Sequence, residues 1–233
     1  MKKFILTFAL LSAVTVLAAQ SLNEIVKNFT VANKLDKISS LQSIKLTGNM
    51  SMMGMDMPMV IYMKNPNKIK SVATIGGQEM VQVFDGEKGY MINPMTGSAT
   101  PVEMGPEEAR QLLRSNVFQN YLDNYLKNNQ LTLEGVENVD GKPAFKIKAA
   151  IEGGNVIRIF IDKNSYLIVK TVADVRQGGT AISLESVPSD YTETNGVLLP
   201  ITTTTSAAGM QFVYKYTEVK VNEPMDDAIF KIR

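Results

Sequence analysis

The sequence predicts a mainly β (α+β) fold: an incomplete antiparallel β-barrel of about eleven strands, with an N-terminal helix and a helical lid that enclose an apolar cavity. Short apolar runs separated by turn pairs such as Asp85-Gly86 and Asn195-Gly196 recur along the chain, which is typical of antiparallel hairpins. Residues 106–128 change to helical spacing. The 233 residues are 45% hydrophobic and 20% charged, so the chain can bury one large core.

The first 19 residues have the pattern of an export signal. Two lysines precede an apolar run over residues 4–17, and Ala18 and Ala19 offer a small-residue cleavage site. An uncleaved membrane anchor is the alternative, but the apolar run is short for a span. We therefore expect a cleaved signal peptide over residues 1–19 and one domain over residues 20–233.

A helix is expected at the start of the mature chain. Ser21 and Glu24 have the spacing of a capping box, in which each side chain bonds the backbone N–H of the other. One helical stripe carries the apolar residues Leu22, Ile25, Val26, Phe29, Ala32 and Leu35. A helix of about a dozen residues with such a stripe must cover an apolar surface, and ordinary core packing is the favoured interpretation.

Methionine is concentrated in the first predicted strands. Seven of the 14 methionines fall between Met50 and Met63. Residues 44–52 alternate apolar and polar, Gly54 marks a turn, and the return strand carries its apolar side chains on one face. We interpret this hairpin as one wall of an apolar container.

The remaining elements follow by periodicity and turn residues. Strands are also expected at residues 69–75, 80–84, up to 92, 131–136, 144–151, 156–161, 166–175, 181–191, 197–205 and 210–221, with a turn at Gly178-Gly179 among others. Pro106 suits the first position of a helix, followed by Glu107 and Glu108 in its first turn. Asn116 is a candidate break between two helices of this insertion, which could cover one end of the sheet.

Composition excludes several classes of function. The chain has no Cys, His or Trp and a formal net charge of +1. It therefore has no zinc site of the usual kind, no Ser-His-Asp or Cys-His catalytic unit, and no basic footprint for nucleic acid. An all-carboxylate hydrolase or a Ser-Lys pair remains formally open. We expect no enzyme, no cofactor, no metal site and no nucleic-acid partner.

Three interpretations of the methionine-rich hairpin compete. Flexible, polarisable thioethers suit an apolar cavity for acyl chains of varied shape, whereas a tightly specified core would favour Leu, Ile and Val. The second interpretation is simple core filling. The third is Cu(I) binding, because thioether sulfur is a soft ligand. Its candidate ligands are Met50, Met52, Met55, Met57 and Met59.

The order of elements resembles the LolA-type periplasmic lipoprotein carriers of the LolA/LolB/LppX superfamily over nearly the whole mature chain. Besides the helical insertion, the segments that carry the resemblance are 35–40, 64–67, Asp85-Gly86, 92–94, 160–164, 196–200, Val221-Asn222 and 228–230. The resemblance implies a half-open barrel with an α-helical lid over a hydrophobic cavity. It also implies a monomeric periplasmic carrier of acylated lipoproteins or other lipids from the inner to the outer membrane.

Partners implied by the resemblance are an inner-membrane lipoprotein-releasing transporter and an outer-membrane acceptor. An envelope sensor or accessory binding module of the same fold is the alternative. In LolA carriers an Arg that helps to hold the lid shut directly precedes the Pro-Asn pair. Here Asn65 occupies that position, and Lys64 would point to the opposite face. The family's gating mechanism is therefore not transferred to this chain.

Strand alternation and the helical insertion together give a set of candidate cavity residues. These lipid-binding candidates are Ile44, Leu46, Met50, Met52, Met59, Ile61, Met63, Ile69, Met80, Phe84, Met91, Leu112, Phe118 and Leu122. The last three would come from the lid. Alternation places the strand residues on one face of each strand but does not show which face lines the interior.

Overall fold

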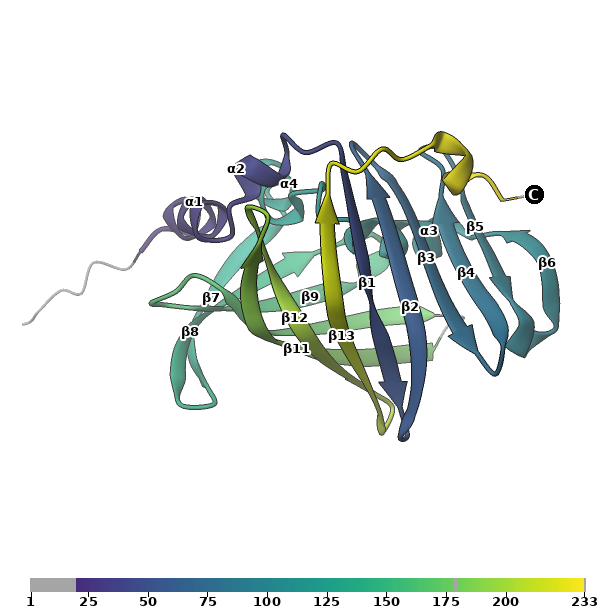
Figure 1. Ribbon diagram of the computed structural model, residues 1–233. Coiled ribbons are helices and arrows are strands. Elements are labelled where there is room, and N and C mark those ends of the chain that lie inside the picture. Colours follow the sequence, from purple (N-terminus) through teal and green to yellow (C-terminus); the bar gives the residue numbers. More distant parts are fainter. Residues whose placement is uncertain (1–19, 178–179, 233) are drawn as a thin grey trace, which may run out of the picture.

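The strands form one antiparallel sheet of 13 strands that is curved and not closed (Figure 1), as expected for an incomplete barrel. The computed structural model describes residues 20–177 and 180–232. The expected export signal and the Gly178-Gly179 turn lie outside the described residues. The strands are β1 Ser43–Met52, β2 Met55–Lys64, β3 Lys68–Ile75, β4 Gln78–Phe84, β5 Gly89–Asn93, β6 Ser98–Glu103, β7 Leu131–Val139, β8 Lys142–Ala150, β9 Val156–Asp162, β10 Ile168–Gln177, β11 Thr180–Thr194, β12 Val197–Ala207 and β13 Met210–Val221.

The first and last strands of the chain are neighbours in the middle of the sheet. The strand order is β6-β5-β4-β3-β2-β1-β13-β12-β11-β10-β9-β8-β7, so among the described strands only the neighbours β1 and β13 are distant in sequence. The register of this pair shifts between Thr47 and Gly48. A Cβ atom on Gly48 would lie 2.2 Å from the carbonyl oxygen of Lys215, so the close approach of the two backbones there requires glycine.

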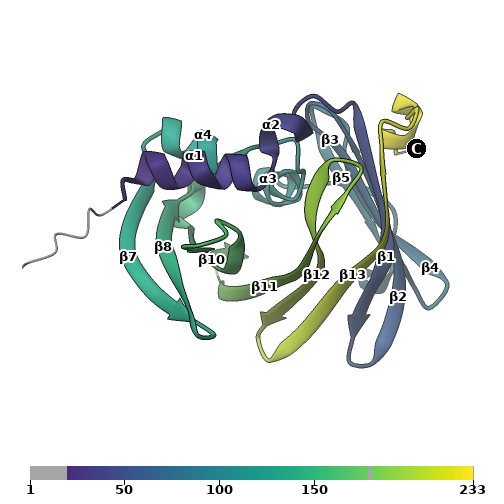
Figure 2. The same ribbon diagram turned by 60° about the vertical axis from the view of Figure 1, so that its left-hand side comes forward.

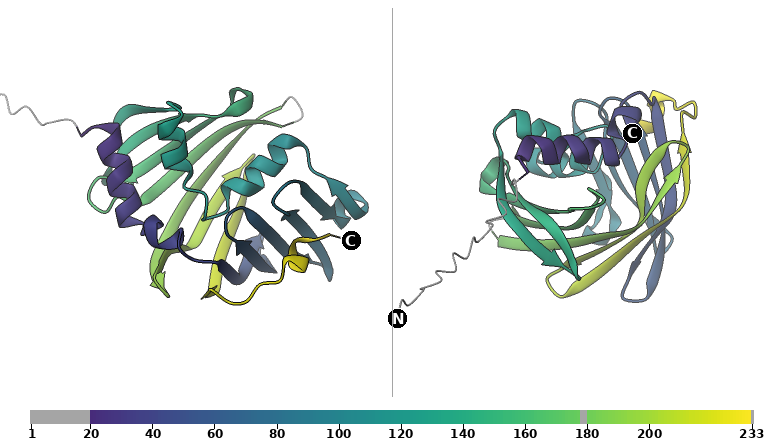
Figure 3. Two further views of the ribbon diagram at one scale, coloured as in Figure 1. Left: turned by 90° about the horizontal axis from the view of Figure 1, so that it is seen from above. Right: turned by 90° about the vertical axis from the view of Figure 1, so that its left-hand side faces the viewer.

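The helices lie across the concave side of the sheet (Figures 2 and 3). They are α1 Leu22–Ala32, α2 Leu35–Ile38, α3 Pro106–Arg114 and α4 Tyr121–Lys127, with short 3₁₀ turns η1 Pro94–Thr96, η2 Glu152–Gly154 and η3 Asp227–Phe230. The cap expected from Ser21 is present, because its hydroxyl accepts the N–H of Glu24. At the start of α3, a carboxylate oxygen of Glu108 accepts the N–H of Gly105, a cap that was not predicted.

Helix α1 contributes to an ordinary apolar core, as favoured from its sequence. Its buried residues Ile25, Val26 and Phe29 pack with Leu122 of α4. The sheet supplies Phe145, Ile147, Ile159 and Ile161 to the same cluster. Burying side chains of this size contributes about 1.5–3 kcal/mol each relative to exposure, so this cluster fixes α1 and α4 over strands β8 and β9.

The structure differs from the expected elements in two places. The first helical stripe does not run through Leu35, because Lys34 adopts a left-handed conformation (φ 54°) and separates α1 from α2. Strand β6 was not expected at all, since it is short, contains Pro101 and lacks an alternating pattern; it lies at one edge of the sheet, where proline is tolerated. The break between the two helices of the insertion at Asn116 is confirmed.

The convex face also has a small apolar cluster. Phe160 is buried there with Val139 and Ala144. The ammonium groups of Lys146 and Lys170 lie 5.8 and 4.7 Å from the centre of its ring. Lysine stems and cation–π contacts thus cover apolar surface on the face opposite to the helices.

Candidate ligand-binding cavity

Strand register places every strand residue of the predicted set in one set of rows, on the face covered by the helices. Met50 pairs with Met57 and Met52 with Met55 across the β1–β2 hairpin. The other cross-strand pairs on this face are Ile44–Met63, Leu46–Ile61, Gly48–Met59, Met63–Ile69, Ile69–Phe84, Ala73–Met80 and Gln82–Met91. Alternation alone did not show which face of the strands lines the interior, and the structure shows that the predicted residues lie on the concave face.

A cavity of about 520 Å³ lies between this face and helix α3; we call it the central cavity. Five of the predicted residues line it, namely Met59, Ile61, Ile69, Met91 and Leu112. Its volume falls in the range of about 300–1,000 Å³ that is usual for ligand pockets.

Other predicted residues lie behind or beside the central cavity. Ile44, Leu46, Met63 and Phe84 are buried in the apolar core under the helices, and Phe118 packs against the same cluster. Met50 is also buried, while Met52 and Met80 are half-buried in the same rows. The binding role of the set stays a prediction, and the structure separates its members into lining and supporting positions.

Two further cavities adjoin the central cavity. The first, of about 360 Å³, lies beneath α1, α2 and α4, contains Leu122 of the predicted set in its lining, and shares Ser115 and Thr203 with the central cavity. The second, of about 410 Å³, is lined largely by β10–β13 and shares Glu108 and Gln111 with it. We call these the α4 cavity and the β11 cavity. The three lie next to one another under the helices, and we call them together the cavity series.

Tyrosine phenols in these linings stay protonated. Burial raises the pKa of Tyr121, Tyr125 and Tyr191 at the α4 cavity above the ordinary value. In the central cavity, burial raises the pKa of Tyr214, and raises that of Tyr216 to about 12. These groups therefore act as neutral hydrogen-bonding groups at physiological pH.

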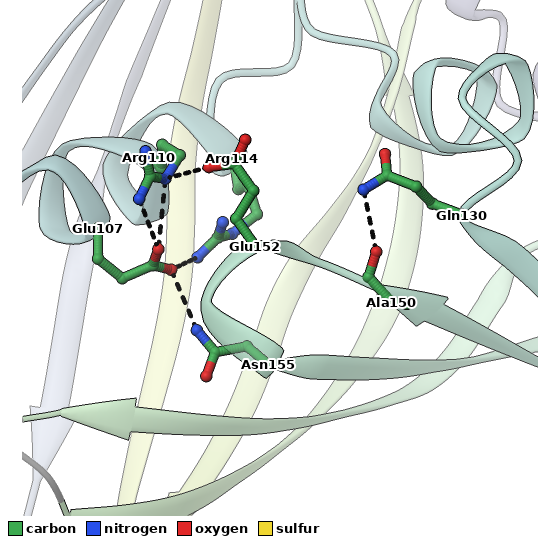
Figure 4. A network of polar contacts seen from close by, with 7 residues as sticks. All are labelled: Glu107, Arg110, Arg114, Gln130, Ala150, Glu152 and Asn155. Atoms are coloured by element: carbon green, nitrogen blue, oxygen red, sulfur yellow. Dashed lines mark hydrogen bonds and ion pairs between the residues drawn. The ribbon is translucent and has the colours of Figure 1, made fainter.

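A polar cluster ties α3 to the turn between β8 and β9 (Figure 4); we call it the α3 clamp. The carboxylate of Glu107 accepts from the guanidinium groups of Arg110 and Arg114, each at 3.1 Å. Arg110 also reaches Glu152 of η2 at 3.0 Å, and the Asn155 amide donates to Glu107 at 3.4 Å. Burial alone would raise the pKa of Glu107, but the hydrogen bonds from Arg114 and Arg110 outweigh it and lower that pKa.

The segment that connects α3 with α4 is fixed to the turn between β2 and β3. The amide of Asn116 donates to Lys68 O at 3.2 Å, and that of Gln119 to Pro66 O at 2.7 Å. Asn65 donates to the carbonyl oxygens of Ser39 and Leu41 and so holds the segment between α2 and β1.

Lys64 does not face the cavity. Its ammonium donates to Met225 O at 2.8 Å and pairs with Asp227 of η3 at 2.6 Å. This agrees with the expectation that Lys64 points to the face opposite to the lid.

The methionine hairpin ends in solvent. Met53 and Met55 are 81% and 58% exposed, whereas Met57 and Met59 are each 4% exposed. The thioethers thus run from the rim of the sheet into its interior. Cu(I) binding by this row is the alternative to the predicted absence of a metal site, and copper titration tests it.

Sequence reasoning missed the polar part of the cavity lining. The central cavity also contains Ser71, Gln82, Glu108, Gln111, Ser115, Thr203, Thr205, Tyr214 and Tyr216. A signal was available for β13, where Phe212, Tyr214 and Tyr216 alternate and fall opposite Met52, Met50 and Gly48. That signal becomes usable only when the pairing of β1 with β13 is known.

No helix in residues 20–177 and 180–232 has both the length and the apolarity needed to cross a membrane. By its fold, the protein therefore belongs to the class of open, barrel-like antiparallel sheets that carry helices over the concave face, with cavities between the sheet and the helices. Scans against family models and curated proteins find no match.

Solved structures share this architecture. A LolA superfamily protein from Nitrosomonas europaea aligns with a TM-score of 0.61 and 12% identity, over 91% of this chain and 98% of that one. A protein from Vibrio parahaemolyticus, named as a domain for outer membrane lipoprotein sorting, aligns with 0.60 and 9% identity over 90% and 97%. A DUF1329 family protein from Desulfovibrio piger aligns with 0.58 and 13% identity over 89% and 97%. The chain has a LolA-like fold.

Proposed function

We propose that this protein is an exported, periplasmic carrier that binds the acyl chains of lipoproteins or other lipids in the cavity series and transfers them from the inner to the outer membrane. The observation that carries the proposal is the cavity series itself, whose α4 member is lined mainly by apolar and aromatic side chains. The name of the Vibrio parahaemolyticus neighbour is consistent with this role. Binding, rather than catalysis, is the expected activity.

Energetics support acyl chains as cargo. Transferring hydrocarbon from water to an apolar site is favourable by about 0.8 kcal/mol per methylene, so a chain of about a dozen methylenes gains on the order of 10 kcal/mol before ordering costs. Met59 and Met91 in the central cavity have flexible side chains that can adapt to such a chain. The helices above them supply the cover that a carrier needs in water.

Lipid binding is tested directly. Native mass spectrometry of the protein purified from the periplasm should show co-purified lipid or acylated protein. A fluorescent fatty acid should bind the protein after its lipid has been removed. Met91→Lys, which puts a charge into the central cavity from a half-buried position, should weaken uptake. Met53→Lys, at an 81% exposed position, is the matched control. Only empty protein together with no uptake would overturn the proposal.

A cellular experiment separates the carrier from an envelope sensor or accessory module. Deletion of the protein should mislocalise outer-membrane lipoproteins or another lipid if it is a carrier. Unchanged lipid and lipoprotein distribution, with a changed envelope response, would favour the sensor. In that case exposed residues of the lid would matter more than the cavity.

A further inference from the structure

The central cavity is much more polar than a site built only for hydrocarbon requires. Nine of its 14 lining residues carry polar side chains, whereas three of the ten lining the β11 cavity do. These groups come from separate elements that the fold brings together. The spacing of Glu108, Gln111 and Ser115 places them on one side of α3, and the cross-strand pair Thr203–Tyr214 lies on the sheet. The pair Ser71–Gln82 contributes from β3 and β4.

Much of this hydrogen-bonding capacity is unused within the protein. Some members have partners: Ser115 donates to Leu112 O, Thr205 shares a hydrogen bond with Ser186, and Glu108 accepts the N–H of Gly105. Within this lining, the side chains with no hydrogen bond to another described residue are Ser71, Gln82, Gln111, Thr203, Tyr214 and Tyr216. Gln111 is exposed, but the other five are half-buried, and polar groups there need water or a ligand as partner.

The charges in the lining select among polar ligands. Glu108 is its only ionisable carboxylate, and no Lys or Arg is among the lining residues. Arg110 and Arg114 are engaged in the α3 clamp, and Arg114 lines the adjoining α4 cavity rather than the central one. Tyr214 and Tyr216 remain neutral phenols. A phosphate, sulfate or carboxylate would therefore meet a carboxylate and no cation, whereas hydroxyl, amide or amine groups would find acceptors and donors.

Resting on the proposed carrier function, we infer that the central cavity binds the polar head of an amphipathic lipid, a non-anionic head rich in hydroxyl or amide groups. Its chains extend into the apolar cavities on either side, which share lining residues with the central one. Gln82 from the sheet and Gln111 from α3 are the principal recognition residues, because a carboxamide offers two donors and an acceptor. A sugar head and the amide-rich terminus of an acylated peptide both have this chemistry.

Chain-matched probes test the inference, because only the head group then varies. The delipidated protein is titrated with dodecyl maltoside, an uncharged N-dodecanoyl peptide with an amidated C-terminus, dodecyl phosphate and dodecanoic acid below their micellar concentrations. We expect the maltoside or the peptide to bind at least about tenfold more tightly than the phosphate, the size expected from two net hydrogen bonds. Whichever of the two binds tighter identifies the source of the head.

Variants connect this preference to the cavity. Gln82→Leu and Gln111→Leu should each reduce the ratio of maltoside or peptide affinity to phosphate affinity by severalfold, while uptake of a head-free fluorescent hydrocarbon stays unchanged. Gln211→Leu makes the same change on β13 outside the lining of the central cavity and should leave the ratio unaltered. Unfolding midpoints of all three variants identify any loss of folding.

Each outcome decides a separate claim. Equal or tighter binding of dodecyl phosphate, or a ratio insensitive to both cavity variants, overturns the head-group inference while leaving acyl binding in place. Failure of every probe, including the hydrocarbon, overturns the carrier proposal together with the inference. The polar subsite stands only if a non-anionic head is preferred and either glutamine carries that preference.

Discussion

Opening of the lid should depend on Glu152 of the α3 clamp. Glu107, Arg110 and Arg114 all lie on α3, so the ion pair that joins this helix to the β8–β9 turn is the one between Arg110 and Glu152, at 3.0 Å. The change to make is Glu152→Gln, which keeps the size of the side chain and removes the charge that pairs with Arg110. Apolar contacts hold the other side of α3, because Leu112 is buried in the core. The variant should therefore release α3 from the β8–β9 turn without unfolding the sheet.

The magnitude follows from the exposure of the pair. The side chains of Arg110 and Glu152 are 43% and 67% exposed, so their interaction is that of an exposed ion pair, about 0.2–1 kcal/mol. That corresponds to an increase of about 1.5–5-fold in the opening equilibrium.

Hydrogen exchange measured by mass spectrometry is the assay. Peptides covering α3 and η2 should exchange faster in Glu152→Gln by this factor, and a bound fluorescent lipid should dissociate faster. Glu103→Gln is the control, since its pair with Lys88 is also an exposed ion pair but includes no residue of α3. Exchange in α3 and η2 identical to that of the unaltered protein would refute the view that the clamp holds the lid.

Two more predictions concern the frame around the cavity. Gly48→Ala should lower the free energy of unfolding by about 3 kcal/mol, because its Cβ would meet Lys215 O at 2.2 Å, and an unchanged urea midpoint would contradict this. Hydrogen bonds from Lys64 and Lys68 lower the pKa of Asp227 to about 2. The ionised carboxylate therefore helps to hold η3 fully above the ordinary pKa of 3.8, and this stabilisation is lost as the pH falls toward 2. Asp227→Asn should speed hydrogen exchange in η3 at neutral pH and abolish the increase in exchange that the unaltered protein shows on acidification. Exchange in η3 that is equally slow in both proteins at pH 7 would argue against it.

Periodicity was sufficient to predict the walls of the cavity. Apolar alternation in β1 and β2 marked Met59 and Ile61, and the register of the sheet places both on the concave face. The helical lid was also predictable, because Leu112 and Leu122 recur at helical spacing. These signals depend on neighbours in sequence, which local patterns record well.

Features made by distant segments could not be predicted in this way. The polar lining depends on the pairing of β1 with β13, since Tyr214 faces the cavity only in that register. The α3 clamp joins Glu107 to Glu152 through Arg110, and no spacing rule connects those residues. Strand β6 gave no signal because an edge strand with Pro101 needs neither alternation nor full hydrogen bonding.

The central position of the β1–β13 pair has a consequence for how the protein folds. Each half of the sheet is a succession of hairpins that can form locally, but Ser43 and Glu223, 180 positions apart, must meet to join them. Closing a loop of that length costs about 4–5 kcal/mol of chain entropy plus a constant, so the joining step should come late and be slow. Met59 and Tyr214 lie on opposite sides of this joint, and both line the central cavity. A bound lipid that contacts both would stabilise the joined sheet, so loading and completion of folding are thermodynamically linked.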